Sequence, residues 1–269
     1  MTIDVATFVG GYPFRHLPDP TPTGLLQQMD RTGIATAWVG HLPSAWHRDP
    51  ADANAELAEL LRPHEQRLRG VATIHPALPR WEDDLRMARE AGAPAVRAYP
   101  TCQGLDAAGP EMRGLIGAAA AAGLPLILTV RFEDVRQRHP LDLVPDLPAA
   151  AIRALARVDP QARLIVTHAD RAVVEEVHFG LTPAEARRIL WDISWIWGPP
   201  EDHLRLLLGT VGLARFTFGT GMPLRIPDGA IAKLDLLELP SDERERITSG
   251  NLQQWLLQAS DERLPSGSP

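Results

Sequence analysis

The sequence predicts a single (β/α)8 barrel from three features: its length, eight short apolar runs that alternate with helical segments, and the turn after the first run. At 269 residues the chain exceeds a usual domain but suits one barrel of about 250 residues. Eight strands separated by helices indicate parallel βαβ units that close on themselves. The first turn, Val9–Pro13, has no GxGxxG pattern, which argues against a doubly wound open sheet.

The expected strands are the apolar runs. In chain order they are Ile3–Val9, Ile34–Gly40, Arg69–His75, Pro94–Tyr99, Pro125–Arg131, Arg163–His168, Ile189–Trp195 and Ala214–Gly219. The barrel is expected to span residues 1–259, and the polar segment 260–269 is expected to be a disordered tail.

Capping residues mark the expected helix boundaries. Starts are predicted at Asp49 before Ala53–Leu61, at the Thr182/Glu185 capping box, and at Ser241 for the last helix. Gly92 and Gly123, each followed by a proline two residues later, are expected to end their helices in the left-handed conformation.

Composition excludes several classes of function. A net charge of −7 argues against nucleic-acid binding, and the single cysteine, Cys102, excludes a disulfide framework and a cysteine-based zinc site. Lys233 is the only lysine beside 26 arginines, a skew that indicates a GC-rich genome rather than phosphate recognition. The sequence shows no membrane span or secretory signal, so we expect a cytoplasmic protein, with a homodimer as the default assembly.

In such a barrel, functional side chains stand at the carboxyl ends of the strands and in the loops after them. Among the polar residues at these places are Arg15, His41, His47, His75, Arg97, Tyr99, Arg131, Glu133, His139, His168, Asp170 and Asp192. The loop over Phe132–Pro145 is long for a connection of this kind, so we expect it to act as a functional loop over the barrel mouth.

Arg97 and Arg131 are the most informative of these candidates, because a guanidinium on an apolar strand needs an anionic or polar partner. We expect them to converge on one carboxylate of a substrate, or else to form structural ion pairs with Asp170 or Asp192. Strand alternation turns Asp192 inward and turns Trp195 toward the helices.

Several segments resemble the motifs of one known family: Ile3-Asp4, Leu68–Pro76, Ala91–Pro100, Val166–His168, Phe218–Pro223 and Asn251–Leu256. The chain is similar over Ile3–Leu257 to the amidohydrolase superfamily, in the branch of barrel hydrolases and aromatic-acid decarboxylases. The resemblance implies a (β/α)8 barrel that, in typical members, uses a divalent metal ion to activate water.

The chain departs from this family at the metal ligands. Where the family has them, the sequence has Ala6, Phe8, Thr129 and Gly221. Only His168 matches, so the resemblance implies an eroded standard metal site. His41, His75 and His168 are candidates for a displaced site that would hold zinc or manganese, although chance placement of nine histidines explains them equally well.

Two functions follow as expectations. The first is a hydrolase or decarboxylase that acts on a small carboxylate-bearing substrate. Its expected substrate-binding residues are Arg15, His47, Arg97, Tyr99, Arg131 and Glu133. His168 would form an acid–base pair with Asp170 or Asp192, and His139 or His47 would be a second acid. The second function is a catalytically degenerate barrel that serves as a small-molecule binding or assembly module.

Overall fold

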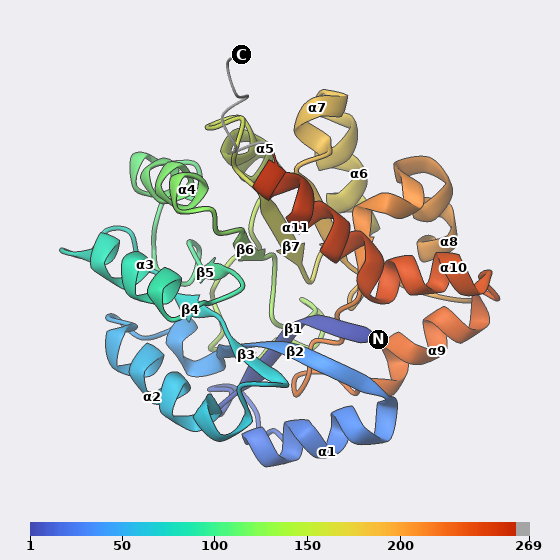
Figure 1. Ribbon diagram of the computed structural model, residues 1–269, viewed down its shortest axis with the longest axis horizontal. Coiled ribbons are helices and arrows are strands. Elements are labelled where there is room, and N and C mark those ends of the chain that lie inside the picture. Colours follow the sequence, from blue (N-terminus) through green and yellow to red (C-terminus); the bar gives the residue numbers. More distant parts are fainter. Residues whose placement is uncertain (262–269) are drawn as a thin grey trace.

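Parallel strands close into a barrel surrounded by helices in the computed structural model of the chain, which describes residues 1–261 (Figure 1). The strands in this part of the chain are β1 (Thr2–Val9), β2 (Ile34–His41), β3 (Leu68–Gly70), β4 (Ala72–Thr73), β5 (Val96–Ala98), β6 (Leu126–Thr129), β7 (Leu164–Thr167), β8 (Ile189–Asp192) and β9 (Phe216–Thr217). Hydrogen bonds from Val5 N to Phe218 O (3.1 Å) and from Gly221 N to Ala6 O (2.8 Å) join the end of the sheet to its start. The predicted (β/α)8 barrel is confirmed.

Each of the eight predicted runs overlaps a strand, and the third run is divided. β3 and β4 are separated at Val71, whose N–H still donates to Val39 O (2.8 Å). One predicted strand, Arg69–His75, therefore appears as two short strands at one position in the ring.

The run predicted over Ile189–Trp195 leaves the sheet early, because β8 ends at Asp192. Asp192 faces the barrel interior as predicted and is fully buried. Trp195 lies beyond the strand, where alternation no longer applies. Its ring stacks on His168 (centroids 5.9 Å apart) and on the Arg225 guanidinium, so the prediction that it faces the helices is wrong.

Helices follow the strands and cover the outside of the barrel (Figure 1). They are α1 (Pro22–Thr32), α2 (Ala51–Leu61), α3 (Trp81–Glu90), α4 (Pro110–Ala122), α5 (Ala149–Ala156), α6 (Arg171–Phe179), α7 (Pro183–Ala186), α8 (His203–Leu207), α9 (Asp228–Leu236), α10 (Ser241–Glu245) and α11 (Asn251–Asp261). The capping box of Thr182 with Glu185 and the left-handed Gly123 (φ +78°) are confirmed. Asp49 is not the N-cap: Pro50 takes that position, and the Asp49 carboxylate accepts a hydrogen bond from Ala51 N (2.9 Å).

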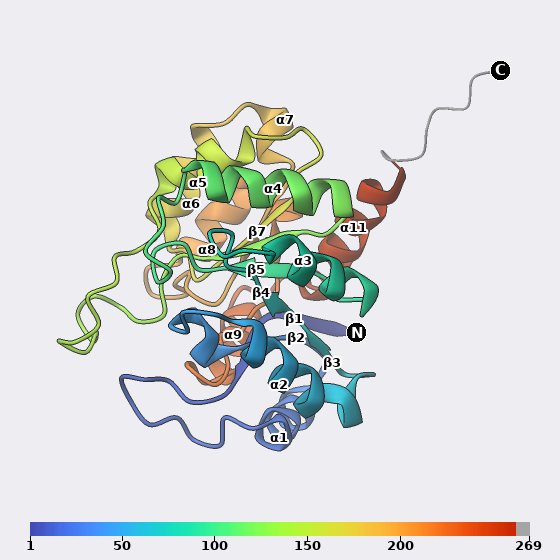
Figure 2. The ribbon, with the colours of Figure 1, turned by 90° about the vertical axis from the view of Figure 1, so that its left-hand side faces the viewer.

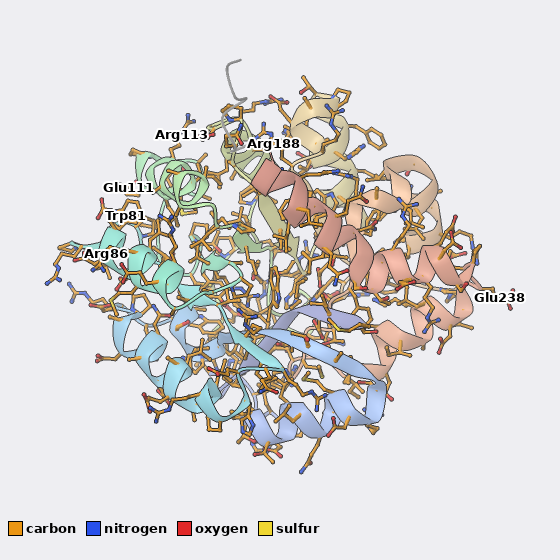
Figure 3. The ribbon with its side chains drawn as sticks, in the orientation of Figure 1. Trp81, Arg86, Glu111, Arg113, Arg188 and Glu238 are labelled. Atoms are coloured by element: carbon orange, nitrogen blue, oxygen red, sulfur yellow. The ribbon has the colours of Figure 1, made fainter. Side chains whose placement is uncertain are left out.

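The barrel interior changes from apolar to polar along its axis. Its lower end is filled by a buried apolar set that includes Ile3, Val5, Trp38, Ile127, Ile165 and Leu190. Leu252 and Trp255 of α11 pack onto this set and close that end. Higher up, the buried inward side chains are Thr73, Arg97, Thr129, Thr167, Asp192 and Thr217. Charged side chains such as Arg86, Glu111 and Glu238 lie on the outer rim (Figure 3).

The segments after β1 and β6 project from the side of the barrel opposite α11 (Figure 2). This side is the mouth, where the carboxyl ends of the strands lie. Helix α11 continues through Asp261, so residues 260 and 261 are helical, contrary to the tail predicted over 260–269. The rest of that segment, residues 262–269, lies outside the described residues. Within residues 1–261, no helix combines the length and apolar character that crossing a membrane requires.

Candidate functional site

A cavity of about 830 Å³ opens at the barrel mouth, between the segments that follow β1, β6, β8 and β9. We call it the mouth cavity. Its aromatic lining consists of Tyr12, Phe14, Trp195 and Trp197, and its basic lining of Arg15, Arg138, His139, Arg225 and Lys233. Glu133 is the one acidic residue among the described residues that line it. Flat apolar walls with an excess of cations suit a small ligand that carries a negative charge.

Arg225 is a cation of this cavity that has no carboxylate partner among the described residues. Its guanidinium lies 3.8 Å from the centre of the Trp195 ring, and its buried Nε has no hydrogen-bond partner within the described chain. Burial lowers the pKa of Arg225, but an arginine side chain stays protonated at physiological pH. A buried cation without an ion pair is costly, so a ligand anion beside it would be stabilising. We call the Arg225 guanidinium and the Trp195 ring on which it lies the carboxylate site, after the ligand group that is proposed for it below.

The loop residues Glu133 and Arg15 meet at the cavity wall. Arg15 Nε donates to Glu133 Oε1 (2.6 Å), and its other nitrogen donates to Leu224 O (2.6 Å), so one side chain joins the segments after β1, β6 and β9. His139, predicted as a second acid, does line the cavity, and its ring stacks on Phe14 with centroids 6.0 Å apart. The structure thus brings Arg15, Glu133 and His139 together as predicted site residues.

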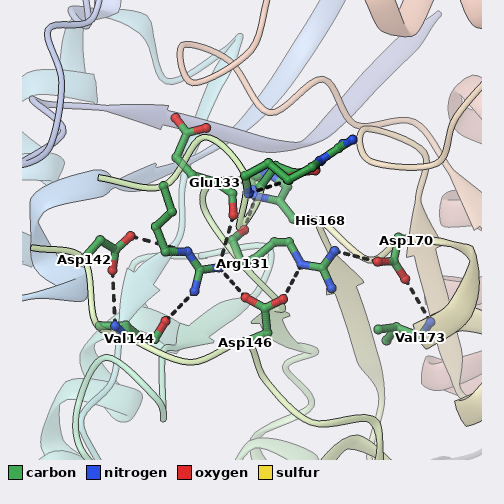
Figure 4. Close-up of polar contacts among 11 residues, drawn as sticks. Arg131, Glu133, Asp142, Val144, Asp146, His168, Asp170 and Val173 are labelled. Carbon is green, nitrogen blue, oxygen red and sulfur yellow. Dashed lines mark hydrogen bonds and ion pairs between the residues drawn. The ribbon is translucent and has the colours of Figure 1, made fainter. Parts of the chain in front are cut away.

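His168 stands next to this cavity but does not line it. Its side chain is fully buried against the rings of Phe8, Phe132 and Trp195. Nδ1 lies 2.8 Å from Arg131 O, and a carbonyl only accepts, so Nδ1 carries the proton and Nε2 presents a lone pair (Figure 4). Burial, followed by the nearby charge of Arg225, lowers the pKa of His168 to about 3, although the hydrogen bond to Arg131 O acts the other way.

The predicted acid–base pair of His168 with Asp170 or Asp192 is not assembled. Asp192 accepts from the backbone N–H of His168 (2.8 Å) rather than from its ring, and also from Ser194 N (3.2 Å). Asp170 caps helix α6 through Val173 N (3.0 Å). Neither carboxylate touches the imidazole, so a ring that is neutral at pH 7 has no partner with which to exchange a proton.

Arg131 and Arg97 do not converge on one anion. Arg131 lies between two carboxylates, Asp146 (2.8 Å) and Asp170 (2.6 Å), as Figure 4 shows. The structural ion pair with Asp170 was the alternative expectation for this residue. Asp146 directly follows the long loop and was not among the predicted site residues.

Arg97 is fully buried inside the barrel and is not among the described residues that line the mouth cavity. Its nitrogens lie 3.4 Å from Tyr99 Oη and 3.4 Å from Val5 O, and its guanidinium lies 4.6 Å from the centre of the Phe8 ring. Gly40 provides the room, because a Cβ there would come within 2.9 Å of Arg97 Nη1. Arg97 and Tyr99 thus contact each other, but neither is among the described residues that line the mouth cavity.

Two buried carboxylates, Asp4 and Asp192, lie in the upper barrel, and Asp4 was not among the predicted site residues. Asp4 accepts from Ala6 N (2.9 Å) and Thr220 Oγ1 (2.6 Å), which ties β1 to the segment after β9. Burial raises the pKa of Asp4 to about 6, opposed by the hydrogen bonds from Thr220 and Ala6. The signal for Asp4 was in the sequence, since a carboxylate inside an apolar strand needs a partner.

The histidines predicted for a displaced metal site lie apart. His41 contacts His47 (ring centroids 5.9 Å apart) and Glu56 (3.7 Å), whereas His168 contacts the aromatic rings named above. Burial lowers the pKa of His75, and the charge of Asp49 opposes this. Within residues 1–261, no three His, Cys, Asp or Glu side chains are grouped so that they could hold a metal ion, so the displaced site is not assembled.

The standard metal positions do not fit a divalent ion either. The side chains there are Ala6, Phe8, Thr129 and Gly221, none of which supplies the imidazole or carboxylate donors that zinc or manganese takes in proteins. The lone pair of His168 faces Gly221: a Cβ built there would lie 3.2 Å from Nε2 and 3.5 Å from Arg225 Cδ. An arginine side chain beside the one remaining ligand repels a cation.

Metal content gives a direct prediction from this donor set. Protein purified without chelator is expected to contain well under one divalent metal ion per chain, because a catalytic site needs about three protein ligands. Elemental analysis measures this. Stoichiometric zinc or manganese that disappears in His168→Ala would contradict the prediction, and stoichiometric metal that disappears in His41→Ala or His75→Ala would establish a displaced site.

Comparisons with known proteins agree with this fold. The profile of a family described as Amidohydrolase matches residues 16–251. Among solved structures, the chain resembles a dihydroxybenzoic acid decarboxylase from Polaromonas with bound manganese and 2-nitroresorcinol (TM-score 0.72, 15% identity, 98% of this chain and 99% of that chain). It also resembles 5-carboxyvanillate decarboxylase from Sphingomonas paucimobilis (TM-score 0.69, 13% identity, 95% and 98%) and a probable 2-pyrone-4,6-dicarboxylic acid hydrolase from Acinetobacter baumannii with citric acid (TM-score 0.65, 13% identity, 95% and 98%). At these identities the likeness shows the fold alone. No curated protein sequence is significantly similar.

Proposed function

The chain belongs to the amidohydrolase family, and from that premise we propose that it is a hydrolase or decarboxylase that binds a small carboxylate-bearing substrate in the mouth cavity. The observation that carries the proposal is Arg225, a cation at the cavity without a carboxylate partner in the described chain. Arg225 takes the role of binding the substrate carboxylate, which the sequence had suggested for Arg97 and Arg131. Arg131 is already paired with Asp146 and Asp170, and Arg97 is buried inside the barrel.

The cavity also favours a flat, unsaturated substrate body. Trp195, Trp197 and Phe14 line it, and aromatic rings stack favourably on one another. The fork of a guanidinium matches a carboxylate with two parallel hydrogen bonds, which would orient the substrate relative to these rings. The structural neighbours include decarboxylases of dihydroxybenzoate and carboxyvanillate, which are carboxylated aromatics.

Proton transfer would fall to residues of the cavity wall. Loss of CO2 from a carboxylate leaves an electron pair on carbon that a proton must capture, and hydrolysis needs a proton for its leaving group. Imidazole is the side chain that proteins use most often for such transfers, and His139 is the one histidine among the described residues that line the cavity. Arg225 would hold the carboxylate, and the aromatic walls would exclude water.

A second candidate function is a binding module without turnover. The closed position of His168 favours it, because the one residue that matches the family's site neither reaches the cavity nor contacts a carboxylate through its ring. This candidate predicts the same ligand affinity as the first and differs only in turnover.

A ligand panel tests the proposal and separates the two candidates. At a ligand concentration about 100 times the dissociation constant, binding should stabilise the fold by about 2.7 kcal/mol. Thermal shifts against benzoate, 2,6-dihydroxybenzoate, phthalate, citrate and aliphatic monocarboxylates are expected to show a rise for the aromatic members. Each hit is then assayed for CO2 release and for hydrolysis, with and without added manganese. A flat panel would refute the proposed substrate class, and binding without turnover would establish the second candidate.

The loop over Phe132–Pro145 is expected to be required for this binding. Arg138 holds it in shape by donating to Val144 O (2.8 Å) and Glu133 O (3.1 Å) and by pairing with Asp146. Arg138→Ala, or deletion of Gln137–Asp142, should weaken binding of a panel hit by about tenfold or more, because the loop carries one wall of the cavity. Titration calorimetry measures the change, with the exposed Val135→Ala of the same loop as control. Unchanged affinity in both loop variants would show that the loop is a passive connection.

A further inference from the structure

Lys233 is a charged side chain that the family resemblance does not explain. It is the only lysine of the chain, it stands on α9, and its side chain lines the mouth cavity and is partly buried. Its ammonium donates to three backbone carbonyls: Ile193 O (2.5 Å), Ser194 O (3.0 Å) and Ile196 O (3.0 Å). An ammonium has three donors, so this arrangement uses all of them.

The three acceptors belong to the turn that follows β8, residues 193–198, which we call the post-β8 turn. This turn has left the sheet, so its carbonyls have no neighbouring strand to bind, and Lys233 of α9 supplies hydrogen bonds to three of them. Ile193 O also accepts from Ile196 N within the turn (3.3 Å). Gly198 makes the approach possible, because a Cβ there would lie 2.8 Å from Lys233 Cγ. A planar guanidinium directs its donors in one plane and does not match three carbonyls around a point.

The post-β8 turn carries Trp195, whose ring separates the mouth cavity from His168 and lies under the Arg225 guanidinium. We propose that Lys233 positions the carboxylate site, because its ammonium holds the turn that carries Trp195, the ring on which Arg225 lies. The ligand of the carboxylate site rests on the proposed function, whereas the contacts of Lys233 with the post-β8 turn do not depend on it. Lys233 is a positioning residue, and the three carbonyls already occupy its donors.

The test compares Lys233→Met and Lys233→Arg with a matched control, Arg244→Ala. Arg244 pairs with Asp235 (2.7 Å), so its loss removes a cation that contacts α9 without touching the post-β8 turn. Two quantities are measured: the dissociation constant of a panel hit, and amide hydrogen exchange of residues 193–198. Both Lys233 variants are expected to weaken binding on the order of 10- to 100-fold and to speed exchange in the turn, because small displacements of a binding group have effects of this size.

Chemical rescue separates positioning from general loss of stability. Lys233→Ala removes Cγ, Cδ, Cε and Nζ, which together correspond to n-propylammonium. Added n-propylammonium is expected to restore slow exchange in the turn and at least half of the lost affinity, whereas n-propanol, of similar volume but with one donor, is expected not to.

Each outcome decides the proposal. Wild-type affinity and wild-type exchange in Lys233→Met would overturn it, as would equal rescue by propanol or an equal effect of Arg244→Ala. If the wild-type chain binds no member of the panel, the proposed function fails, and the exchange and rescue measurements alone decide whether Lys233 holds the turn.

Discussion

Raising the pH from 4 to 6.5 is expected to destabilise the wild-type chain relative to Asp4→Asn by about 2 kcal/mol in free energy of unfolding. Burial raises the pKa of Asp4 to about 6 in the folded chain, from 3.8 in the unfolded chain. Between these values the folded state keeps a proton that the unfolded state releases. The contribution is therefore fully present below pH 3.8 and is lost as the pH rises through 6.

Asparagine is a suitable replacement because its Oδ1 can still accept from Ala6 N and Thr220 N, as the carboxylate does. Urea unfolding of both proteins across this pH range measures the difference. Asp134→Asn is the matched control: hydrogen bonds from Arg136 lower the pKa of Asp134, so its contribution has the opposite sign. A constant difference between wild type and Asp4→Asn across the range would show that Asp4 stays ionised in the folded chain.

Trp255→Ala is expected to lower the free energy of unfolding by about 3–5 kcal/mol, the usual cost of removing a large buried aromatic side chain. Trp255 is 2% exposed and closes the lower end of the barrel. Its Nε1 donates to Arg187 O (3.1 Å), and the Arg163 guanidinium lies 5.2 Å from its ring centre, so the variant also loses polar contacts.

The control for this variant stands on the same helix. Leu257 is 67% exposed, so Leu257→Ala should change stability by less than about 0.5 kcal/mol. Urea denaturation measures both. A loss below about 1 kcal/mol in Trp255→Ala would mean that α11 does not close the barrel core.

The fold could be predicted because its signals are local. The alternation of apolar runs with helical segments predicted the strands. A glycine followed two residues later by a proline predicted helix ends such as Gly123. The alternation of side chains along a strand correctly predicted that Arg97 and Asp192 face the barrel interior. The prediction failed for Trp195, because side chains alternate only within a strand and β8 ends three residues earlier, at Asp192.

The site could be predicted less well because its contacts are long-range. Arg131 stands on its predicted strand end, but its partner Asp146 reaches it only through the path of a long loop. Arg225 and Lys233 come from the connection after β9, whose position depends on the packing of the whole mouth. One signal was available in the sequence. Lys233 is the only lysine beside 26 arginines, and an ammonium directs its hydrogen bonds differently from a planar guanidinium.

Calorimetric titration of a panel hit into wild type, Arg225→Ala and Arg171→Ala tests whether Arg225 holds the carboxylate of the ligand. Arg171 lies near the mouth but lines a neighbouring cavity and is paired with Glu175 (2.9 Å), so it controls for loss of a nearby cation. Hydrogen bonds to a charged group contribute about 1.5–3 kcal/mol each, so Arg225→Ala should raise the dissociation constant by at least about tenfold. Arg171→Ala should leave it within about twofold. Equal affinity in wild type and Arg225→Ala would contradict the assignment of the carboxylate site.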